Sequence, residues 1–207
     1  MAGGRGSRMG LAVEKPLLTI RGKTLIEHVL ERIRSSKSLS RMICVTSPHT
    51  NETRRLVQRL GYEVVETKGT GYLEDLRSVL ESLGEGLYAT FSADVPFIDV
   101  STVDSLLADH REGGPLDFDY VLVVVPEELV TRLGMPTGSA TKIKTSWGCF
   151  IPTGLRMIRV SSQIRVWSVL RGPKIRIIDH PGFAVNVNTS EDLKRAEELA
   201  GHFLESS

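Results

Sequence analysis

The stretch AGGRGSRMG (residues 2–10), followed by EKP at residues 14–16, is the most informative part of this chain. Closely spaced glycines let the main chain approach a ligand and turn its N–H groups inward, which makes a concave site for an anion. Arg8 and Lys15 follow the glycines, so both cations can contact oxygens that the N–H groups leave uncovered. The pattern therefore predicts a phosphate-binding loop near the start of the sequence.

Two other phosphate-binding loops do not fit this stretch. A P-loop ends in Gly-Lys-Ser/Thr, which these residues lack. A dinucleotide-binding loop would need a third glycine at position 9, where Met9 stands, followed directly by a helix. A glycine-rich N-terminal tail is the remaining alternative on composition alone, but the order of Arg8, Glu14, Lys15 and Pro16 after the glycines favours a binding loop.

Strand-like and helix-like patterns alternate along the rest of the chain. Short apolar runs bounded by turn residues predict strands at 41–46, 62–65, 87–91, 120–125, 174–178 and 183–187. Apolar residues at helical spacing predict helices at 25–33, 51–60, 72–83 and from residue 190 onward. Thr50 is a candidate cap for the second of these helices, and Ser190 begins a capping box for the last.

This alternation predicts a mostly parallel sheet with helices on both sides. The run 121–125 is apolar at every position, as expected for a strand that is buried on both faces. The segment 111–119 is the most loop-like part of the chain, yet it is short for a domain boundary. We therefore predict one α/β domain over residues 1–207.

The composition is that of an ordinary globular protein. The 207 residues carry 26 Lys and Arg against 25 Asp and Glu, and 41% of them are hydrophobic. These values exclude a disordered or collagen-like chain. A formal net charge of +1 argues against a general polyanion binder. We therefore expect no nucleic acid among the partners.

No pattern in the chain predicts export or membrane insertion. The first ten residues lack the apolar segment of a signal peptide. The longest apolar run, 121–125, is much too short to span a bilayer. Cys44 and Cys149 lie far apart without metal-binding spacing, so both are interpreted as buried thiols in a reducing compartment. We expect a cytoplasmic protein without a membrane partner.

Asp94 is a candidate metal ligand, and two asparagines stand in another polar segment near the last helix. Asp94 follows the predicted strand 87–91, and ligands bind at the carboxyl ends of strands in open α/β sheets. A carboxylate there suits Mg²⁺, although an Asp before Val95-Pro96 can also simply begin a turn. Asn186 and Asn188 lie in NVNTSEDL, where Asn188 or a nearby hydroxyl could cap the last helix, although a cap would account for only one of the two asparagines.

The turn Gly69-Thr70-Gly71 directly precedes the predicted helix 72–83. The start of a helix can present N–H groups to a ligand, and glycines let a flat base lie against the main chain. An ordinary strand-to-helix loop would have the same sequence, so the residues alone leave both interpretations open.

Five segments together resemble the nucleotidyltransferases that make nucleoside-diphosphate conjugates, a superfamily that includes molybdenum-cofactor guanylyltransferase. These segments are AGGRGSRMG…EKPLL, KGTGY (68–72), ADVP (93–96), WGCF (147–150) and NVNTSEDL (186–193). The short length and the runs TSPHT and KGTGYLEDL are most similar to the archaeal GTP:adenosylcobinamide-phosphate guanylyltransferases. The resemblance spans nearly the whole chain.

The resemblance implies a three-layer, Rossmann-like fold with a nucleotide-binding N-terminal half and an acceptor-binding C-terminal half. It implies transfer of GMP from GTP to adenosylcobinamide phosphate, with release of pyrophosphate and with Mg²⁺ as cofactor. Molybdopterin or a sugar 1-phosphate is the alternative acceptor, and a non-catalytic nucleotide-binding module is the third hypothesis. A homodimer is compatible with this resemblance.

The resemblance also assigns site residues. It implies that Arg8, Lys15 and Asp94 are catalytic, and that Asp94 and Asn188 bind the metal, with Asn186 as the alternative to Asn188. The implied nucleotide-binding residues are Ala2, Gly3, Gly4, Gly6, Ser7, Arg8, Lys15, Gly69, Thr70, Gly71, Asp94 and Gly148.

The chain departs from the resembling enzymes at its first strand. In those enzymes a strand interior to the sheet precedes the glycine loop, whereas this sequence begins inside the loop. Buried backbone groups without partners cost about 1–3 kcal/mol each. We therefore expect that roughly 4–8 apolar residues precede Met1 in the native protein, about one strand's length, and that Met1 is a misplaced start.

Overall fold

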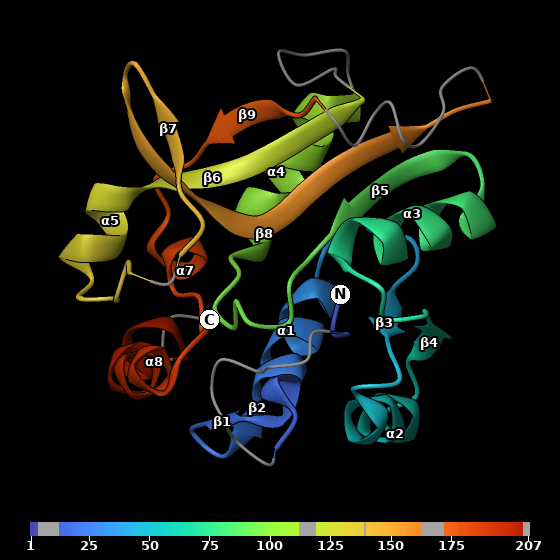
Figure 1. The fold of residues 1–207 in the computed structure, drawn as a ribbon, viewed down its shortest axis with the longest axis horizontal. Helices are drawn as coiled ribbons and strands as arrows, with labels where there is room; N and C mark the ends of the chain where they lie inside the picture. The colour runs from blue at the N-terminus through green and yellow to red at the C-terminus, as the bar shows by residue number, and fades with distance from the viewer. Residues whose placement is uncertain (4–12, 112–118, 139, 163–171, 205–207) are drawn as a thin grey trace.

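The computed structural model describes residues 1–3, 13–111, 119–138, 140–162 and 172–204. Strands and helices alternate along these residues, and the strands lie between helices (Figure 1). The expected α/β fold class is confirmed.

The larger sheet has the strand order β5-β8-β6-β9, with β7 paired to β8. Its strands are β5 (Gly86–Thr90), β6 (Tyr120–Pro126), β7 (Ile143–Thr145), β8 (Gly148–Val160) and β9 (Lys174–Ile177). Strand β9 is parallel to β6, while β8 is antiparallel to β5, β6 and β7. Strands β5, β6 and β9 therefore run in one direction, and their carboxyl ends lie at the same edge.

Two further pairs of strands lie outside this sheet. Strands β3 (Ile43–Thr46) and β4 (Glu63–Glu66) form a parallel pair, and β1 (Thr19–Ile20) and β2 (Lys23–Thr24) form a short antiparallel hairpin. The β3–β4 pair stands beside the larger sheet on the side of β5 (Figure 1).

Helices connect most of these strands. A short 3₁₀ helix, η2 (Lys15–Leu17), precedes the β1–β2 hairpin. The α-helices are α1 (Leu25–Arg34), α2 (Asn51–Arg59), α3 (Tyr72–Leu83), α4 (Val100–Arg111), α5 (Glu127–Arg132), α7 (Pro181–Ala184) and α8 (Ser190–Leu204). The four predicted helices are confirmed as α1, α2, α3 and α8. The patterns that we used did not find α4 and α5.

Side chains of neighbouring residues on β6 and β8 point to opposite faces of the sheet. Tyr120 and Ile158 lie opposite each other and pack against α3. Val121 and Met157, one residue along each strand, belong to the main core together with residues of α1, α4 and α8. The sheet is therefore covered on both faces, which gives the three layers that the alternation predicts.

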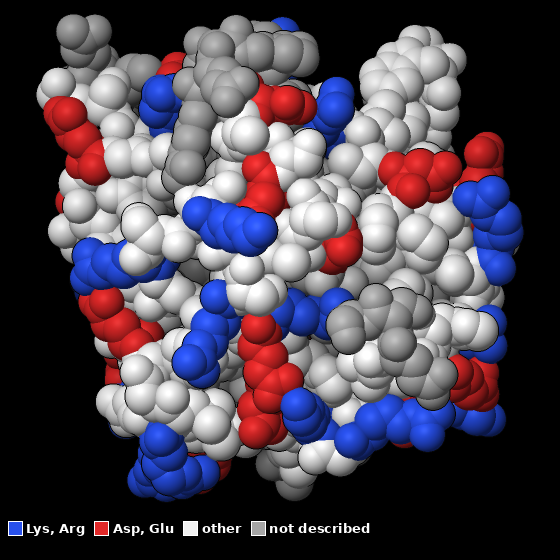
Figure 2. Space-filling model, turned by 180° about the vertical axis from the view of Figure 1, so that it is seen from behind, with Lys and Arg blue, Asp and Glu red and all other residues white. Residues whose placement is uncertain are grey.

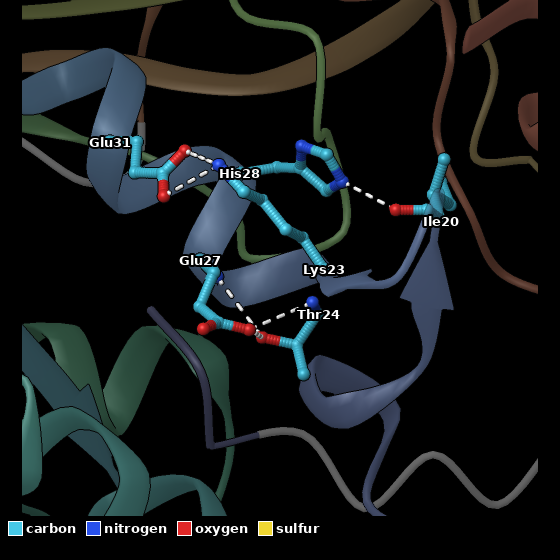
Figure 3. A network of polar contacts seen from close by, with 6 residues as sticks. All are labelled: Ile20, Lys23, Thr24, Glu27, His28 and Glu31. Carbon is cyan, nitrogen blue, oxygen red and sulfur yellow. Dashed lines mark hydrogen bonds and ion pairs between the residues drawn. The ribbon is translucent and has the colours of Figure 1, made fainter.

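Helix α1 begins at a capping box that also ties it to the β1–β2 hairpin (Figure 3). The Thr24 hydroxyl accepts a hydrogen bond from the Glu27 N–H at 3.3 Å, and the Glu27 carboxylate accepts one from the Thr24 N–H at 2.9 Å. The same hydroxyl donates to that carboxylate, which lowers the pKa of Glu27. His28 contacts the Ile20 carbonyl at 2.9 Å through Nε2. These contacts hold the β1–β2 hairpin against α1, and the hairpin directly follows the η2 segment that carries Lys15.

The strand predicted at 183–187 is wrong. Residues Pro181–Ala184 form helix α7. Proline favours the first turn of a helix, and the His180 side chain caps this turn by accepting a hydrogen bond from the Gly182 N–H at 3.2 Å. A short apolar run is compatible with a buried strand or a buried helix, so its pattern could not separate the two.

Strand β8 runs from Gly148 to Val160, well beyond the segment WGCF (147–150) that carries the family resemblance. It continues to Val160 although it contains Pro152 and Gly154, residues that usually weaken a predicted strand. Gly154 has a φ of +78°, and a Cβ atom there would lie 2.5 Å from the Ser92 Cβ atom. Pairing with β6 shifts register between Leu122 and Val124. The irregularity lets β8 bend past the segment that follows β5.

On the face seen in Figure 2, charged side chains are mixed rather than gathered by sign, with Lys and Arg among Asp and Glu. Within the described ranges, no helix is long and apolar enough to cross a membrane. Cys44 is buried as expected, whereas Cys149 is partly exposed because it lies near the start of β8, beside the β7–β8 turn.

Candidate active site

Three polar side chains from distant parts of the sequence meet just beyond the carboxyl end of β5. The Lys15 Nζ atom donates hydrogen bonds to Asp94 Oδ2 at 2.5 Å and to Asn188 Oδ1 at 3.0 Å. The Lys15 and Asp94 side chains are 16% and 19% exposed, so their ion pair is largely shielded from water while keeping some access to it. The structure thus brings together one predicted catalytic cation and both favoured metal ligands.

Lys15 is held in place through the residue before it. The Glu14 carboxylate accepts hydrogen bonds from the Glu52 N–H at 2.8 Å and from the Thr53 N–H at 2.7 Å. These are free N–H groups in the first turn of α2, where a negative charge is stabilising. Pro16 is buried in the η2 turn that follows. Glu14 therefore anchors the segment that carries Lys15 to the start of α2.

Thr50 stands at the predicted position before α2, but the prediction that its side chain caps the helix is wrong. Its hydroxyl instead accepts a hydrogen bond from the Ser47 N–H at 3.1 Å and closes the turn after β3. Glu14 supplies the cap from 38 residues away, a contact that the local sequence of α2 could not reveal.

Asp94 lies in the turn that follows β5. Its main-chain carbonyl accepts a hydrogen bond from the Val187 N–H at 2.9 Å, which joins this turn to the segment before α8. Its Oδ2 atom faces Lys15. Its Oδ1 atom is buried and has no hydrogen-bond partner among the described residues. A buried carboxylate oxygen without a partner is costly in a folded protein, so this atom points to a ligand.

Asn188 faces Lys15 and leaves the capping of α8 to its neighbours. The Thr189 hydroxyl accepts from the Asp192 N–H at 3.1 Å, and the Asp192 carboxylate accepts from the Thr189 N–H at 2.8 Å. The capping box thus forms on Thr189, one residue before the predicted Ser190. Asn186 lies behind Asn188 and accepts a hydrogen bond from its Nδ2 group at 3.0 Å.

The oxygen atoms around Lys15 fit a hard divalent cation. Asp94 Oδ2 and Asn188 Oδ1 converge on the one point that the ammonium group occupies, and Asp94 Oδ1 is available beside them. Mg²⁺ needs only one or two protein oxygens, because water and substrate phosphates complete its coordination. No cluster of three or more His, Cys, Asp or Glu side chains suited to a metal occurs in the described part of the chain. The Mg²⁺ assignment stays a prediction, and this geometry supports it.

The predicted glycine segments approach each other at Ser47. The Ser47 hydroxyl donates to the Gly3 carbonyl at 2.7 Å. A Cβ atom at Gly3 or at Gly69 would lie 3.1 Å from the Ser47 Cβ atom, so both glycines permit close approach of the main chain. Ala2 is buried beside them. Sequence reasoning missed Ser47, because no spacing relates it to either glycine segment.

The N–H groups of the Gly69-Thr70-Gly71 turn are partly occupied. The Asp75 carboxylate accepts hydrogen bonds from the Gly69 N–H at 3.1 Å and from the Thr70 N–H at 3.4 Å. Gly69 has a φ of +68° and Gly71 a φ of +149°, so the turn needs glycine at both positions. A base that binds here would find the Gly69 and Thr70 N–H groups already bonded to Asp75, with open space beside Gly71.

A pocket of about 210 Å³ adjoins Asn186 and Asn188. Most of its other lining is apolar, including Val130, Met135 and Ile151. Of the described residues that line it, one is cationic, Arg156 of β8. This arginine was not among the predicted site residues. The one signal that could have found it is an arginine within a largely apolar run, and Arg159 on the same strand gives the same signal without lining the pocket.

Two aromatic residues hold the Arg156 guanidinium group in place. It lies 4.4 Å from the centre of the Tyr72 ring, and it donates to the Tyr72 hydroxyl at 2.7 Å and to the Tyr120 hydroxyl at 3.2 Å. Burial raises the pKa of Tyr72, while the charge of Arg156 opposes that rise. Arg156 is therefore a fixed positive charge on the wall of the pocket.

The remaining predicted residues lie elsewhere. Gly148 is in the exposed β7–β8 hairpin, opposite Thr145, and does not line the 210 Å³ pocket. Gly4, Gly6, Ser7 and Arg8 lie outside the described residues.

Comparisons with known proteins place the chain among nucleotide-transferring enzymes. A family model described as MobA-like NTP transferase domain matches residues 1–132. The adenosylcobinamide-phosphate guanylyltransferase of Methanocaldococcus jannaschii is 28% identical over 205 residues, which cover 96% of this chain and 94% of that protein. The 2-C-methyl-D-erythritol 4-phosphate cytidylyltransferase of Leptospira borgpetersenii serovar Hardjo-bovis is 24% identical over 95% of this chain and 90% of that protein.

A solved structure shares the fold. CMP:2-keto-3-deoxy-manno-octonic acid synthetase, in its complex with CTP, superposes with a TM-score of 0.70 and covers 94% of each chain. The sequence identity is 17%, so this likeness bears on the architecture alone.

Proposed function

This chain belongs to the family of MobA-like NTP transferase domains, and we propose that it transfers the guanylyl group of GTP to adenosylcobinamide phosphate. The chain is a nucleotidyltransferase. The choice of GTP and of the acceptor is supported by the similarity to the guanylyltransferase of Methanocaldococcus jannaschii, which extends over 96% of this chain. We further propose that residues 1–207 form a single catalytic domain.

In this reaction a phosphate oxygen of the acceptor attacks the α-phosphorus of GTP. A new P–O bond forms to the acceptor, the bond between the α-phosphorus and the bridging oxygen breaks, and pyrophosphate leaves. The attacking phosphate is already ionised at neutral pH, so no strong general base is needed. Rate enhancement then comes mainly from holding the two phosphates in line and from stabilising the charge that develops.

The position of the Lys15 ammonium group between Asp94 and Asn188 is the observation that carries this proposal. The Lys15 ammonium group is bonded to two oxygens and is partly exposed. Its hydration therefore changes little when it turns from these oxygens to a phosphate oxygen. We assign Lys15 to the α-phosphate and the incoming oxygen, and Arg8 to the phosphates that become pyrophosphate. Preorganised cations of this kind stabilise transition-state charge most effectively in a shielded site.

Asp94 and Asn188 would hold Mg²⁺, which would supply further positive charge against the phosphate oxygens. The residues around them keep these ligands in position. The Val187 N–H holds the main chain of Asp94, and Asn186 holds the side-chain amide of Asn188. The glycine segment Gly3 to Gly6 would bind the phosphates through its N–H groups.

The 210 Å³ pocket is too small for a corrinoid ring, but it can admit the phosphate end of such an acceptor. Arg156 lies on its wall with its guanidinium plane fixed, and arginine binds phosphate through paired N–H groups. We therefore assign the acceptor phosphate to this pocket, with the bulk of the acceptor outside it.

Pyrophosphate release from GTP, measured with a panel of acceptors, tests this function. The panel contains adenosylcobinamide phosphate, molybdopterin, 2-C-methyl-D-erythritol 4-phosphate and a hexose 1-phosphate. We expect release with adenosylcobinamide phosphate, a strong preference for GTP over ATP, CTP and UTP, and no turnover in EDTA. A site that hydrogen-bonds guanine leaves polar groups unpaired with adenine, so the preference should be large.

Each other outcome has a distinct meaning. Release only with another acceptor would replace the proposed substrate and retain the chemistry. Equal rates with ATP and GTP would contradict the guanylyl assignment. No release with any acceptor, together with normal GTP binding, would favour a nucleotide-binding module without turnover.

A further inference from the structure

Trp147 has the most exposed large apolar side chain in the described part of the chain, with 61% of its surface open to water. It stands at the tip of the β7–β8 hairpin, in the short turn between Thr145 and Gly148. A single exposed apolar side chain needs no explanation by itself. What sets Trp147 apart is the way it is held and the pocket that its hairpin adjoins.

The Trp147 ring packs against the ring of Phe150. The two ring centres are 4.9 Å apart and the ring planes are inclined by 52°, a separation at which aromatic pairs attract each other. Phe150 is buried and packs with Leu122 and Val124 of β6. Gly148 leaves room for this arrangement, because a Cβ atom there would lie 3.1 Å from the Phe150 Cζ atom. Phe150 therefore supports the indole from within the protein, while most of the indole stays exposed.

Hydrogen bonds fix the hairpin on which Trp147 stands. The Thr145 hydroxyl accepts a hydrogen bond from the Trp147 N–H at 3.3 Å and donates one to the Gly148 carbonyl at 3.2 Å. Just before β7, the Lys142 Nζ atom donates to Glu127 Oε1 at 2.5 Å, which ties this side of the hairpin to the start of α5. A surface that is already ordered loses less entropy when a ligand binds. The hairpin therefore presents Trp147 in a prepared position.

The hairpin and the 210 Å³ pocket share their walls. Thr141, just before β7, and Pro152, just after the hairpin on β8, both line the pocket. Two residues of a β-strand span about 7 Å, which is the separation along β8 between Phe150 and the pocket wall at Pro152. The aromatic pair of Trp147 and Phe150 thus continues the pocket wall along the strand.

Phe150, Pro152 and Arg156 lie on the same face of β8. Pro152 and Arg156 are paired with Val124 and Leu122, the two β6 residues that pack with Phe150, and directly paired residues point to the same face of a sheet. Helix α3 covers one end of β8, and the hairpin stands at the other end (Figure 1). The fixed guanidinium charge and the exposed indole therefore lie along one strand, with the pocket wall between them.

The proposed acceptor extends beyond the pocket. Its phosphate is assigned to Arg156, and the pocket is too small for the corrinoid ring, so the ring must lie against a surface outside the pocket. A conjugated ring gains stacking and dispersion energy against an aromatic side chain. Trp147 offers such a surface at the edge of the pocket.

We propose that Trp147 binds the ring system of the acceptor, which lies along β8 with its phosphate at Arg156 and its ring against the indole. This inference rests on the proposed function, because that function supplies the acceptor. In this arrangement Gly148 serves the acceptor rather than the nucleotide, since it leaves room for the Phe150 ring that supports the indole.

The test compares the wild type with Trp147→Ala and Trp147→Phe, and Leu60→Ala is the matched control. Leu60 is 44% exposed at the end of α2 and does not line the pocket. We expect the KM for adenosylcobinamide phosphate to rise about 10-fold in Trp147→Ala, as for loss of one stacking partner. In Trp147→Phe, which keeps an aromatic face, the rise should be less than about 3-fold. The kcat and the KM for GTP should stay within about 2-fold of the wild type in every variant, because only acceptor binding is changed.

Equilibrium dialysis separates this inference from the proposed function. Adenosylcobinamide, the acceptor without its phosphate, reports binding of the ring without any turnover. We expect the wild type and Leu60→Ala to bind it about 10-fold more tightly than Trp147→Ala does. The phosphate ester of 1-amino-2-propanol, which lacks the ring, should bind equally to the wild type and to Trp147→Ala. If the wild type releases no pyrophosphate but shows this difference in dialysis, the proposed function is wrong and the role of Trp147 stands.

Three results would overturn the role of Trp147. One is an active wild type whose KM for the acceptor is unchanged in Trp147→Ala. Another is a wild type that does not bind adenosylcobinamide, or binds it no better than Trp147→Ala does. The third is a dimer of the wild type, seen by analytical ultracentrifugation, that dissociates in Trp147→Ala while the KM for the acceptor stays the same, because the indole would then contact a second copy of the chain.

Discussion

The polar cluster of Lys15, Asp94 and Asn188 and the pocket beside it are built in different ways. In the cluster, polar atoms from three distant segments are held to one another at 2.5 and 3.0 Å. In the pocket, most side chains are apolar, and Arg156 is the only cation among the described residues that line it. The two regions meet at Asn186 and Asn188, which belong to both.

This difference separates two tasks. Charge that acts on a transferring phosphoryl group must be fixed before the reaction, and interlocked polar contacts achieve that. Selection among acceptors needs shape and one orienting charge, and we assign this task to the apolar pocket with its fixed arginine. Variants in the cluster should therefore change turnover for every acceptor, whereas variants in the pocket should change acceptor affinity.

The largest expected effect follows from Asp94→Asn. This change keeps the shape of the side chain but removes the charge that faces Lys15 and the proposed Mg²⁺. We expect kcat to fall by a factor on the order of 10² to 10³, the range for loss of one preorganised charge partner, with GTP as donor and any accepted acceptor. Steady-state pyrophosphate release measures it.

Glu31→Gln is the matched control for Asp94→Asn. It removes one partner of the ion pair between Lys23 and Glu31, whose charged atoms are 2.7 Å apart. Both side chains of this pair are about half exposed, and neither belongs to the cluster. We expect its kcat to stay within about 2-fold of the wild type, because exposed ion pairs contribute little. A wild-type rate for Asp94→Asn would show that the cluster is not the reacting site.

Helices and the cluster differ in how far the sequence predicts them. Helix α3 (Tyr72–Leu83) has the bounds that its apolar spacing predicts, and Leu76, Val79 and Leu80 on one face of it are buried. The position of Asp94 after a predicted strand places it at the carboxyl edge of the sheet, and the structure has it there, just beyond β5. In contrast, Glu14 reaches the start of α2 across 38 residues, and Arg156 reaches Tyr72 across 84. Such contacts depend on the tertiary fold, so no local pattern contains them.

The same reasoning explains the error at 183–187. Apolar residues there are buried, as the pattern indicated, but His180 and Pro181 start a helix instead of a strand. Burial could be predicted from composition, while the choice of element depended on a cap just outside the apolar run.

An intermediate effect is expected from Arg156→Met, which tests the pocket directly. Loss of the guanidinium group removes the charge that we assign to the acceptor phosphate. We expect the KM for the acceptor to rise by roughly 10- to 30-fold, as for loss of one charge-assisted hydrogen bond, and the KM for GTP to change by less than about 3-fold.

Arg159→Met is the control for Arg156→Met, because Arg159 lies on the same strand and does not line the pocket. It should leave both KM values near those of the wild type. A rise in the KM for GTP rather than for the acceptor, in Arg156→Met alone, would reassign the pocket to the nucleotide.

The smallest expected effect comes from Asn186→Ala, at the boundary of the two regions. Asn186 contacts neither Lys15 nor Asp94 through its side chain, but it accepts the hydrogen bond that orients the Asn188 amide. Without that bond the Asn188 oxygen can turn away from the cluster. Outer partners that orient a metal ligand typically contribute about 10-fold or more to metal affinity. We therefore expect the Mg²⁺ concentration for half-maximal rate to rise about 10-fold, while the rate at saturating Mg²⁺ stays within about 3-fold of the wild type.

Asn186→Asp keeps the accepting oxygen and should restore most of the Mg²⁺ affinity. If Asn186→Ala instead lowered the saturated rate and left the Mg²⁺ requirement unchanged, Asn186 would act on the acceptor side, and the boundary between the two regions would lie at Asn188.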